Sequence, residues 1–171
     1  MSKVLNEIKQ RASLLGKHIV LPEGEDKRVV EAASVSVKEG IAKITLLGNR
    51  EEIVRENPDV DLSGVTVIDP LTYEKTEEYA DLLYELRKAK GMTPELARET
   101  LKKDYTMYGA LMLKAGDVDG MVSGACHSTA NTLRPGLQVI KTAPGTPIVS
   151  AYFLMIAPEC GNRYCEDGCY I

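Results

Sequence analysis

The sequence predicts a three-layer α/β protein built around a mostly parallel sheet. Short apolar runs typical of buried strands occur at residues 18–22, 43–48, 65–69 and 119–124. The segments between these runs carry apolar side chains at helical spacing. Strands that alternate with helices form βαβ units, in which right-handed crossovers join parallel strands.

Start and stop signals bound the predicted helices. Residues 3–15 place their apolar side chains on one helical face. Asp26 is a typical helix-capping residue, and the helix that it opens is expected to end at Gly40. Pro94 follows Thr93 at a favoured first helical position. Further helices are expected at residues 51–56, 79–86 and 105–115.

A domain boundary is expected at the Pro- and Gly-containing segment 143–147. Residues 1–145 would form the N-terminal part of a first α/β domain, and residues 146–171 the start of a second. The apolar run 148–156 predicts a strand of a second sheet. The sequence stops as another strand opens at residues 169–171, so a truncated chain is expected.

Composition and charge exclude several classes of protein. With 44% hydrophobic and 27% charged residues, the chain has an ordinary globular composition. A formal net charge of -4 argues against a nucleic-acid partner bound through bulk positive charge. No apolar run approaches the roughly 18 residues of a membrane span, and the first residues do not resemble a signal peptide. A cytoplasmic protein without a membrane or nucleic-acid partner is expected.

Three of the four cysteines crowd the end of the sequence. Cys160, Cys165 and Cys169 have the spacing C-x4-C-x3-C, which is not that of paired C-x2-C zinc knuckles. These residues are interpreted as reduced thiols, and no metal site is expected.

The loop at residues 123–135 carries the chemistry. It follows a predicted parallel strand, at the edge where open α/β sheets bind ligands. Ser128 and Thr129 offer hydroxyl groups, and Arg134 offers a planar fork suited to phosphate. Pro135 is expected to start a helix, whose positive end would favour an anion. The residues alone equally allow a helix-capping loop in which Arg134 forms a surface ion pair.

The stretch SGACHSTANTLRPGLQVIKTAPG closely resembles the signature region of phosphate acetyl- and butyryltransferases. The earlier stretch LPEGEDKRVVEAA resembles the opening of the same family. The resemblance implies a two-domain architecture of the isocitrate/isopropylmalate dehydrogenase type and a homodimer when full-length. It also implies coenzyme A as a substrate, without a bound cofactor or catalytic metal. Family members are about twice as long, and their reactive serine, arginine and aspartate would lie beyond Ile171. No catalytic residue is therefore assigned, and this chain alone is expected to be inactive.

The resemblance also assigns binding roles. Ser128, Thr129 and Arg134 would bind the acyl phosphate, with Ser123 and Gly124 shaping the floor of the site. The candidates for contacts to coenzyme A phosphates are Arg28 and Arg87, although a solvated surface role is equally compatible with their positions.

Two neighbouring side chains in this loop receive lesser roles. His127 is interpreted as an orienting group, since no carboxylate partner is evident in the sequence. Cys126 stands where the family more often has an aliphatic residue, and it is interpreted as a small packing residue. The expected reaction is direct attack of the coenzyme A thiol on the acetyl carbonyl, in preference to an acetyl-enzyme on Ser128 or Cys126.

The implied activity is exchange of acetyl between acetyl phosphate and coenzyme A. Phosphate butyryltransferase is an alternative, because one methylene changes discrimination by only about 1–3 kcal/mol. A non-catalytic remnant of such an enzyme is another. A metal-dependent decarboxylating dehydrogenase is disfavoured, since no aspartate cluster adjoins the loop and no G-x-G-x-x-G follows a strand.

Overall fold

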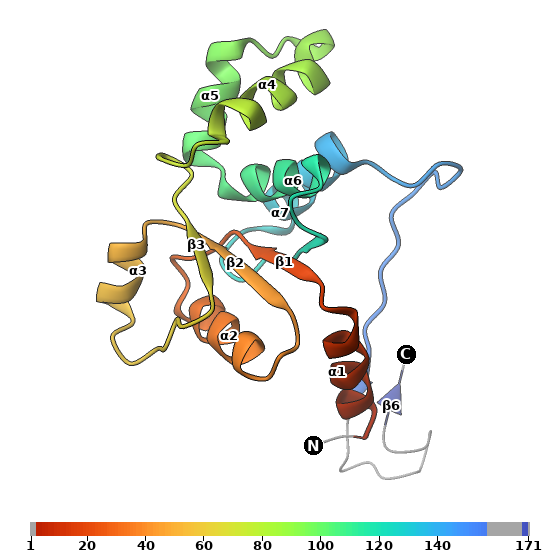
Figure 1. The fold of residues 1–171 in the computed structure, drawn as a ribbon. Helices are drawn as coiled ribbons and strands as arrows, with labels where there is room; N and C mark the ends of the chain where they lie inside the picture. The colour runs from red at the N-terminus through yellow and green to blue at the C-terminus, as the bar shows by residue number, and fades with distance from the viewer. Residues whose placement is uncertain (1–2, 157–168, 171) are drawn as a thin grey trace. The chain divides into compact units, whose positions relative to one another are not determined.

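A computed structural model describes residues 3–156 and 169–170 (Figure 1). The chain divides into two compact units. One unit is Lys17–Lys141, and the other combines Met1–Gly16 with Thr142–Ile171. Each unit is described by itself below.

The larger unit contains a four-stranded parallel sheet, as the sequence predicts. Its strands are β1 (His18–Leu21), β2 (Lys43–Leu47), β3 (Thr66–Ile68) and β4 (Gly120–Met121). They pair in the order β3-β2-β1-β4, with every pair parallel. The chain therefore moves outward from β1 to β3 and then returns to the other side of β1. β4 has only two residues, fewer than the apolar run suggested.

One face of this sheet is covered by α2 (Lys27–Lys38) and α3 (Arg50–Glu56). Val30 of α2 and Ile53 of α3 are buried in one apolar cluster with Ile44 and Leu46 of β2. Asp26 caps α2 as predicted, because its carboxylate accepts a hydrogen bond of 2.9 Å from the backbone N–H of Arg28.

The opposite face is covered by helices that follow β3. They are α4 (Thr76–Arg87), the short 3-10 turn η1 (Lys88–Lys90), α5 (Pro94–Lys103) and α6 (Tyr105–Ala115). Val20 of β1 and Leu47 of β2 point to this side and share a second apolar cluster with Tyr108 of α6. Alternate residues of one strand thus enter different cores, which gives the three predicted layers.

The smaller unit contains α1 (Lys3–Leu15) and a two-stranded antiparallel ladder of β5 (Met155–Ile156) and β6 (Cys169–Tyr170). The prediction of a strand over residues 148–156 is wrong for most of its length, because only Met155 and Ile156 pair. Tyr152 and Phe153 are 78% and 82% exposed. Apolar composition alone does not make a strand when backbone groups lack a pairing partner.

One prediction concerns side chains at this end of the chain that the structure does not describe. Cys160 and Cys165 lie outside the described residues, and so does the side chain of Cys169. Their assignment as reduced thiols stays a prediction. Within the described part of the chain, no helix combines the length and apolar character needed to cross a membrane.

Candidate functional site

The candidate site lies at the carboxyl ends of β1 and β4, where the order of strands in the sheet reverses. β1 and β4 are neighbours, and both carboxyl ends are followed by loops. The loop after β1 leads to α2 on one face, whereas the loop after β4 leads to α7 (Thr129–Pro135) and the π-helical turn η2 (Gly136–Ile140). η2 packs against α6 on the other face through Val139. Loops that diverge at such a switch point leave a crevice that suits a ligand.

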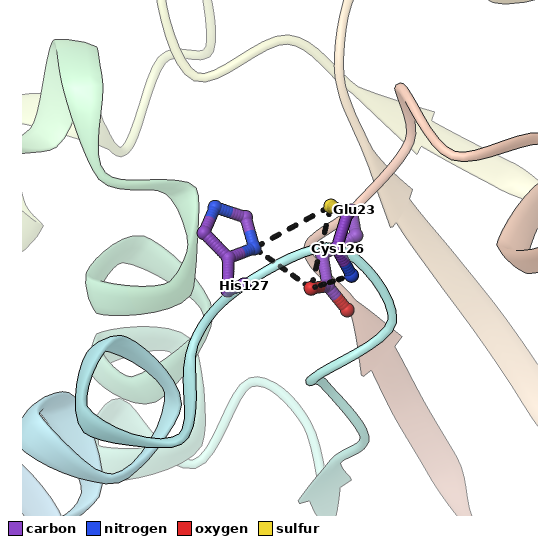
Figure 2. A group of neighbouring side chains, drawn as sticks. All are labelled: Glu23, Cys126 and His127. Carbon is purple, nitrogen blue, oxygen red and sulfur yellow. Dashed lines mark hydrogen bonds and ion pairs between the residues drawn. The ribbon is translucent and has the colours of Figure 1, made fainter.

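A buried carboxylate joins the two loops. Glu23, at the end of β1, is only 1% exposed. Its Oε2 accepts hydrogen bonds from the backbone N–H groups of Gly124 at 2.8 Å and Ala125 at 2.9 Å. Its Oε1 accepts from the N–H of Cys126 at 3.1 Å and from Nδ1 of His127 at 2.7 Å. Figure 2 shows this side chain beneath the loop that carries Cys126 and His127.

Two glycines make the contact between the loop after β1 and the loop after β4 sterically feasible. A Cβ atom on Gly24 would lie 2.2 Å from the carbonyl oxygen of Leu47, so the chain can leave β1 here only without a side chain. Gly124 has φ +113°, a conformation that strongly favours glycine, and it turns consecutive N–H groups toward one point.

Arg28 also holds the loop after β4, through a backbone carbonyl group. Its Nη2 donates to the carbonyl oxygen of Ala125 at 2.7 Å. The guanidinium also holds Asp26 through two further hydrogen bonds, of 3.0 and 2.6 Å. This pairing lowers the pKa of Asp26. The Arg28 side chain is still 72% exposed, which leaves N–H groups of its fork accessible to a ligand.

The hydrogen bonds keep Glu23 ionised. Burial raises the pKa of Glu23, but the bonds from His127 and the three backbone N–H groups outweigh it and lower this pKa to about 2. The same bond raises the pKa of His127, because it stabilises the charged imidazolium. An ionised carboxylate only accepts hydrogen bonds, so Nδ1 of His127 carries the proton.

Cys126 is exposed, so its interpretation as a packing residue is wrong. Its Sγ lies 3.4 Å from Oε1 of Glu25 and 3.5 Å from Oε1 of Glu23. Burial of the sulfur and the two nearby carboxylates raise the pKa of the thiol to about 12. The thiol is thus protonated near neutral pH, which argues against Cys126 as a nucleophile.

Three potential metal ligands meet in this cluster. Ligand atoms of Glu23, Cys126 and His127 all lie within 4.8 Å of one another. Both oxygens of Glu23 already accept backbone N–H groups, and Oε1 also accepts Nδ1–H of His127. Hydrogen bonding therefore accounts for the cluster, and we describe it as a polar network.

The helix after this loop begins earlier than predicted. Ser128 is the N-cap of α7, and its Oγ accepts from the N–H of Asn131 at 3.3 Å. Pro135 ends α7 instead of opening a helix, and its buried ring leads into η2. Arg134 consequently lies in the last turn, where its Nη2 donates to Oδ1 of Asn131 at 2.6 Å. The expectation that Arg134 adjoins a helix start is wrong.

The structure brings some predicted residues together and leaves others apart. Ser123 and Arg28 line one hollow of about 270 Å³ with Glu23, beside apolar side chains of β1 and α2. The hydroxyl of Ser123 is buried without a hydrogen-bond partner among the described residues. Ser128 and Thr129 follow His127 directly at the exposed start of α7. Arg87 lies in the last turn of α4, and no described hydrogen bond ties it to this loop.

Glu23 is the residue that sequence reasoning missed. The only local signal is an acidic residue between Pro22 and Gly24 at the carboxyl end of a buried strand. Its partners lie 101 to 104 residues further along the chain. The missing carboxylate partner of His127 is this residue.

Comparison with known proteins identifies the family. Residues 3–170 match the sequence model described as phosphate acetyl/butaryl transferase. A phosphate acetyltransferase of Acetivibrio thermocellus is 54% identical over 167 residues, which cover 98% of this chain and 49% of that relative. A phosphate acetyltransferase of Thermoanaerobacterium thermosaccharolyticum is 46% identical over 98% of this chain and 50% of its own length.

Solved structures agree with the sequence match. A phosphotransacetylase from Streptococcus pyogenes superimposes with a TM-score of 0.84 at 37% identity, over 93% of this chain and 49% of that one. The EutD phosphotransacetylase from Staphylococcus aureus gives 0.77 at 37% identity, over 85% and 44%. The fold of this chain is thus shared with about half of each of these two phosphotransacetylases. The chain belongs to the phosphate acetyl/butaryl transferase family, and it spans about half the length of these relatives.

Proposed function

We propose that the protein containing this chain exchanges acetyl between acetyl phosphate and coenzyme A. The observation that carries the proposal is the family match over residues 3–170. The relatives named above are phosphate acetyltransferases, which favours acetyl over butyryl as the transferred group.

The proposed binding residues surround the loop after β4. Ser128 and Thr129 hold the acyl phosphate through their hydroxyl groups, and Arg134 neutralises its charge. Arg134 is exposed in α7 and is oriented by Asn131, which supports this role. Ser123 and Gly124 form the floor; the buried unpartnered hydroxyl of Ser123 is a group that a ligand or water would satisfy.

Coenzyme A is the second substrate. Arg28 is placed to contact its phosphates, since it reaches the loop and keeps exposed N–H groups. Arg87, in the last turn of α4, remains a second candidate for a contact to these phosphates.

The reaction is direct acyl transfer. The coenzyme A sulfur forms a bond to the acetyl carbonyl carbon, and the bond from that carbon to the phosphate oxygen breaks. The electron pair leaves with the phosphate, whose growing negative charge Arg134 stabilises. The thiol gives its proton to a base outside the residues assigned here. The raised pKa of the Cys126 thiol supports this path over an acetyl-enzyme on that residue.

The remaining features of the whole protein are also proposals. They are a dehydrogenase-type two-domain architecture with a boundary near residue 145, a homodimer, and a cytoplasmic location.

An activity assay with two proteins tests the function. One is the 171-residue chain. The other extends this chain with the second half of the Acetivibrio thermocellus relative. We expect acetyl-coenzyme A formation from acetyl phosphate only with the extended protein, because groups that act together lose most of their effect when separated. The isolated second half is the control.

Two results would contradict this reading. A folded extended protein without activity would reject the function and favour a non-catalytic remnant. Turnover by the purified 171-residue chain alone would show that the reacting groups lie in this half.

A further inference from the structure

The loop after β4 contains an anion-binding arrangement that is already filled. Three consecutive backbone N–H groups, from Gly124 to Cys126, converge on the carboxylate of Glu23. Such a concave set of N–H groups commonly binds phosphate. Here an internal carboxylate occupies it, so a substrate phosphate has to bind to the groups that follow in the chain.

The same carboxylate determines how His127 is presented. Glu23 accepts the proton on Nδ1, at 2.7 Å, and is the ion-pair partner that the structure gives to this imidazole. The other ring nitrogen, Nε2, points away from Glu23 (Figure 2). The His127 side chain is 34% exposed, and the described hydrogen bonds of its ring involve Nδ1 and not Nε2. Ser128 and Thr129, the proposed phosphate-binding residues, come next in the chain at the start of α7.

Several other groups act on this imidazole. Glu25 lies in the loop between β1 and α2, and Asp104 caps α6. Both carboxylates favour the charged ring, as Glu23 does. The Cys126 thiol lies 3.5 Å from Nδ1. The guanidinium of Arg28 holds the carbonyl oxygen of Ala125 in the same loop.

We propose that Glu23 is a positioning residue for acetyl transfer, which fixes the loop after β4 and holds His127 so that Nε2–H donates to the acyl phosphate. This inference rests on the proposed function. Glu23 acts through its partners without touching substrate, whereas His127 is a phosphate-binding residue beside Ser128 and Thr129. The dyad resembles other carboxylate–imidazole pairs, in which a buried carboxylate fixes the direction of the ring. Here the carboxylate also favours the imidazolium, the form in which Nε2 carries a proton.

Kinetics of the extended protein test the positioning role. Glu23→Gln keeps the side-chain volume but places an amide group against backbone N–H groups. We expect kcat/KM for acetyl phosphate to fall about 100-fold, a loss typical of misplaced reacting groups. Glu31→Gln is the matched control, since Glu31 lies on the exposed surface of α2 and pairs only with Lys27 among the described residues. It should keep wild-type activity.

The pH profile separates this role from a merely structural one. With imidazolium as the donor, activity falls as the pH rises through the pKa of His127. Since Glu23 raises that pKa, Glu23→Gln should move the alkaline limb to lower pH. In His127→Gln, the fall in activity at alkaline pH should be absent. NMR titration of His127 in the extended protein, compared between wild type and Glu23→Gln, gives the same shift without an activity assay.

Each result has a distinct meaning. An active wild type whose Glu23→Gln variant keeps both kcat/KM and the alkaline limb would overturn the positioning role alone. An inactive, folded wild-type extended protein would overturn the proposed function. A reduced kcat/KM with an unmoved limb would leave Glu23 a stabilising residue and also reject the proposal.

Discussion

The two ends of the segment after β4 present their polar groups in different directions. At its first end, Gly124, Ala125 and Cys126 direct their backbone N–H groups inward to a carboxylate that is 1% exposed. At its second end, Ser128 and Arg134 are exposed, and they are held mainly by bonds to Asn131 of the same helix.

This difference separates the scaffold from the proposed ligand site within one short motif. The inward end binds an anion that belongs to the protein, so its geometry exists before any substrate arrives. The outward end keeps its charge and hydroxyl groups accessible to an anion from solution. Preorganised groups of this kind are effective because they need no rearrangement when the substrate binds.

Removing the internal anion should have the largest effect on stability. In Glu23→Ala, three N–H groups and an imidazolium lose a buried acceptor. We expect the free energy of unfolding to fall by about 3–5 kcal/mol, the usual cost of breaking a buried charge pair. Urea denaturation followed by circular dichroism would measure it. A loss below about 1 kcal/mol, similar to that of surface substitutions, would show that the inward end does not depend on Glu23.

Acid should remove the contribution that ionised Glu23 makes to the free energy of unfolding. Because folding lowers the pKa of Glu23 from 4.5 to about 2, its contribution is fully present above pH 4.5 and is lost as the pH falls toward 2. The shift corresponds to roughly 3 kcal/mol. The stability difference between wild type and Glu23→Gln should therefore shrink over this range. A difference that stays constant from pH 5 to 2.5 would contradict the lowered pKa.

At the second end, substitution of Arg134 should affect catalysis more than stability. In the extended protein, Arg134→Ala should lower kcat/KM for acetyl phosphate about 100-fold, near 3 kcal/mol of transition-state stabilisation, with little loss of stability. Steady-state kinetics with both substrates varied would show it. Lys114→Ala, at a cation in the last turn of α6, is a control. Unchanged kcat/KM would remove Arg134 from the site.

The smallest expected effect concerns the thiol between the two ends. Although Cys126 is exposed, its pKa of about 12 should make alkylation by iodoacetamide at pH 8 at least tenfold slower than that of glutathione. Glu25→Gln should speed the reaction, since it removes one nearby carboxylate. Mass spectrometry of the Cys126 peptide measures both rates. A rate equal to that of glutathione would mean that the carboxylates do not control this thiol.

Local signals in the sequence were sufficient for most of the larger unit. The apolar runs predicted β1 and β2. Asp26 was confirmed as the cap of α2, and Pro94 was confirmed at the start of α5. These features depend on residues close in the chain, where propensity, capping and periodicity act. The motif after β4 indicated the family for the same reason, because its residues are contiguous.

Pro135 and the apolar segment 148–156 show where local signals failed. Proline is common at a helix start, but Ser128 had already capped α7, and the missing N–H of Pro135 falls at the passage into a π-helical turn. The apolar segment became a strand only at Met155–Ile156, where β6 supplies a partner.

By itself, therefore, the sequence determined the α/β class and the order of helices and strands as far as β4, and it indicated the loop after β4 as the candidate site. Only the tertiary structure decided that Glu23 would fill the first half of that loop and bind His127. The physical reason is distance along the chain: a carboxylate and N–H groups 101 to 103 residues apart meet only because β1 and β4 pair side by side. Sequence periodicity describes neighbours within an element, whereas this contact depends on which strands become neighbours in the sheet.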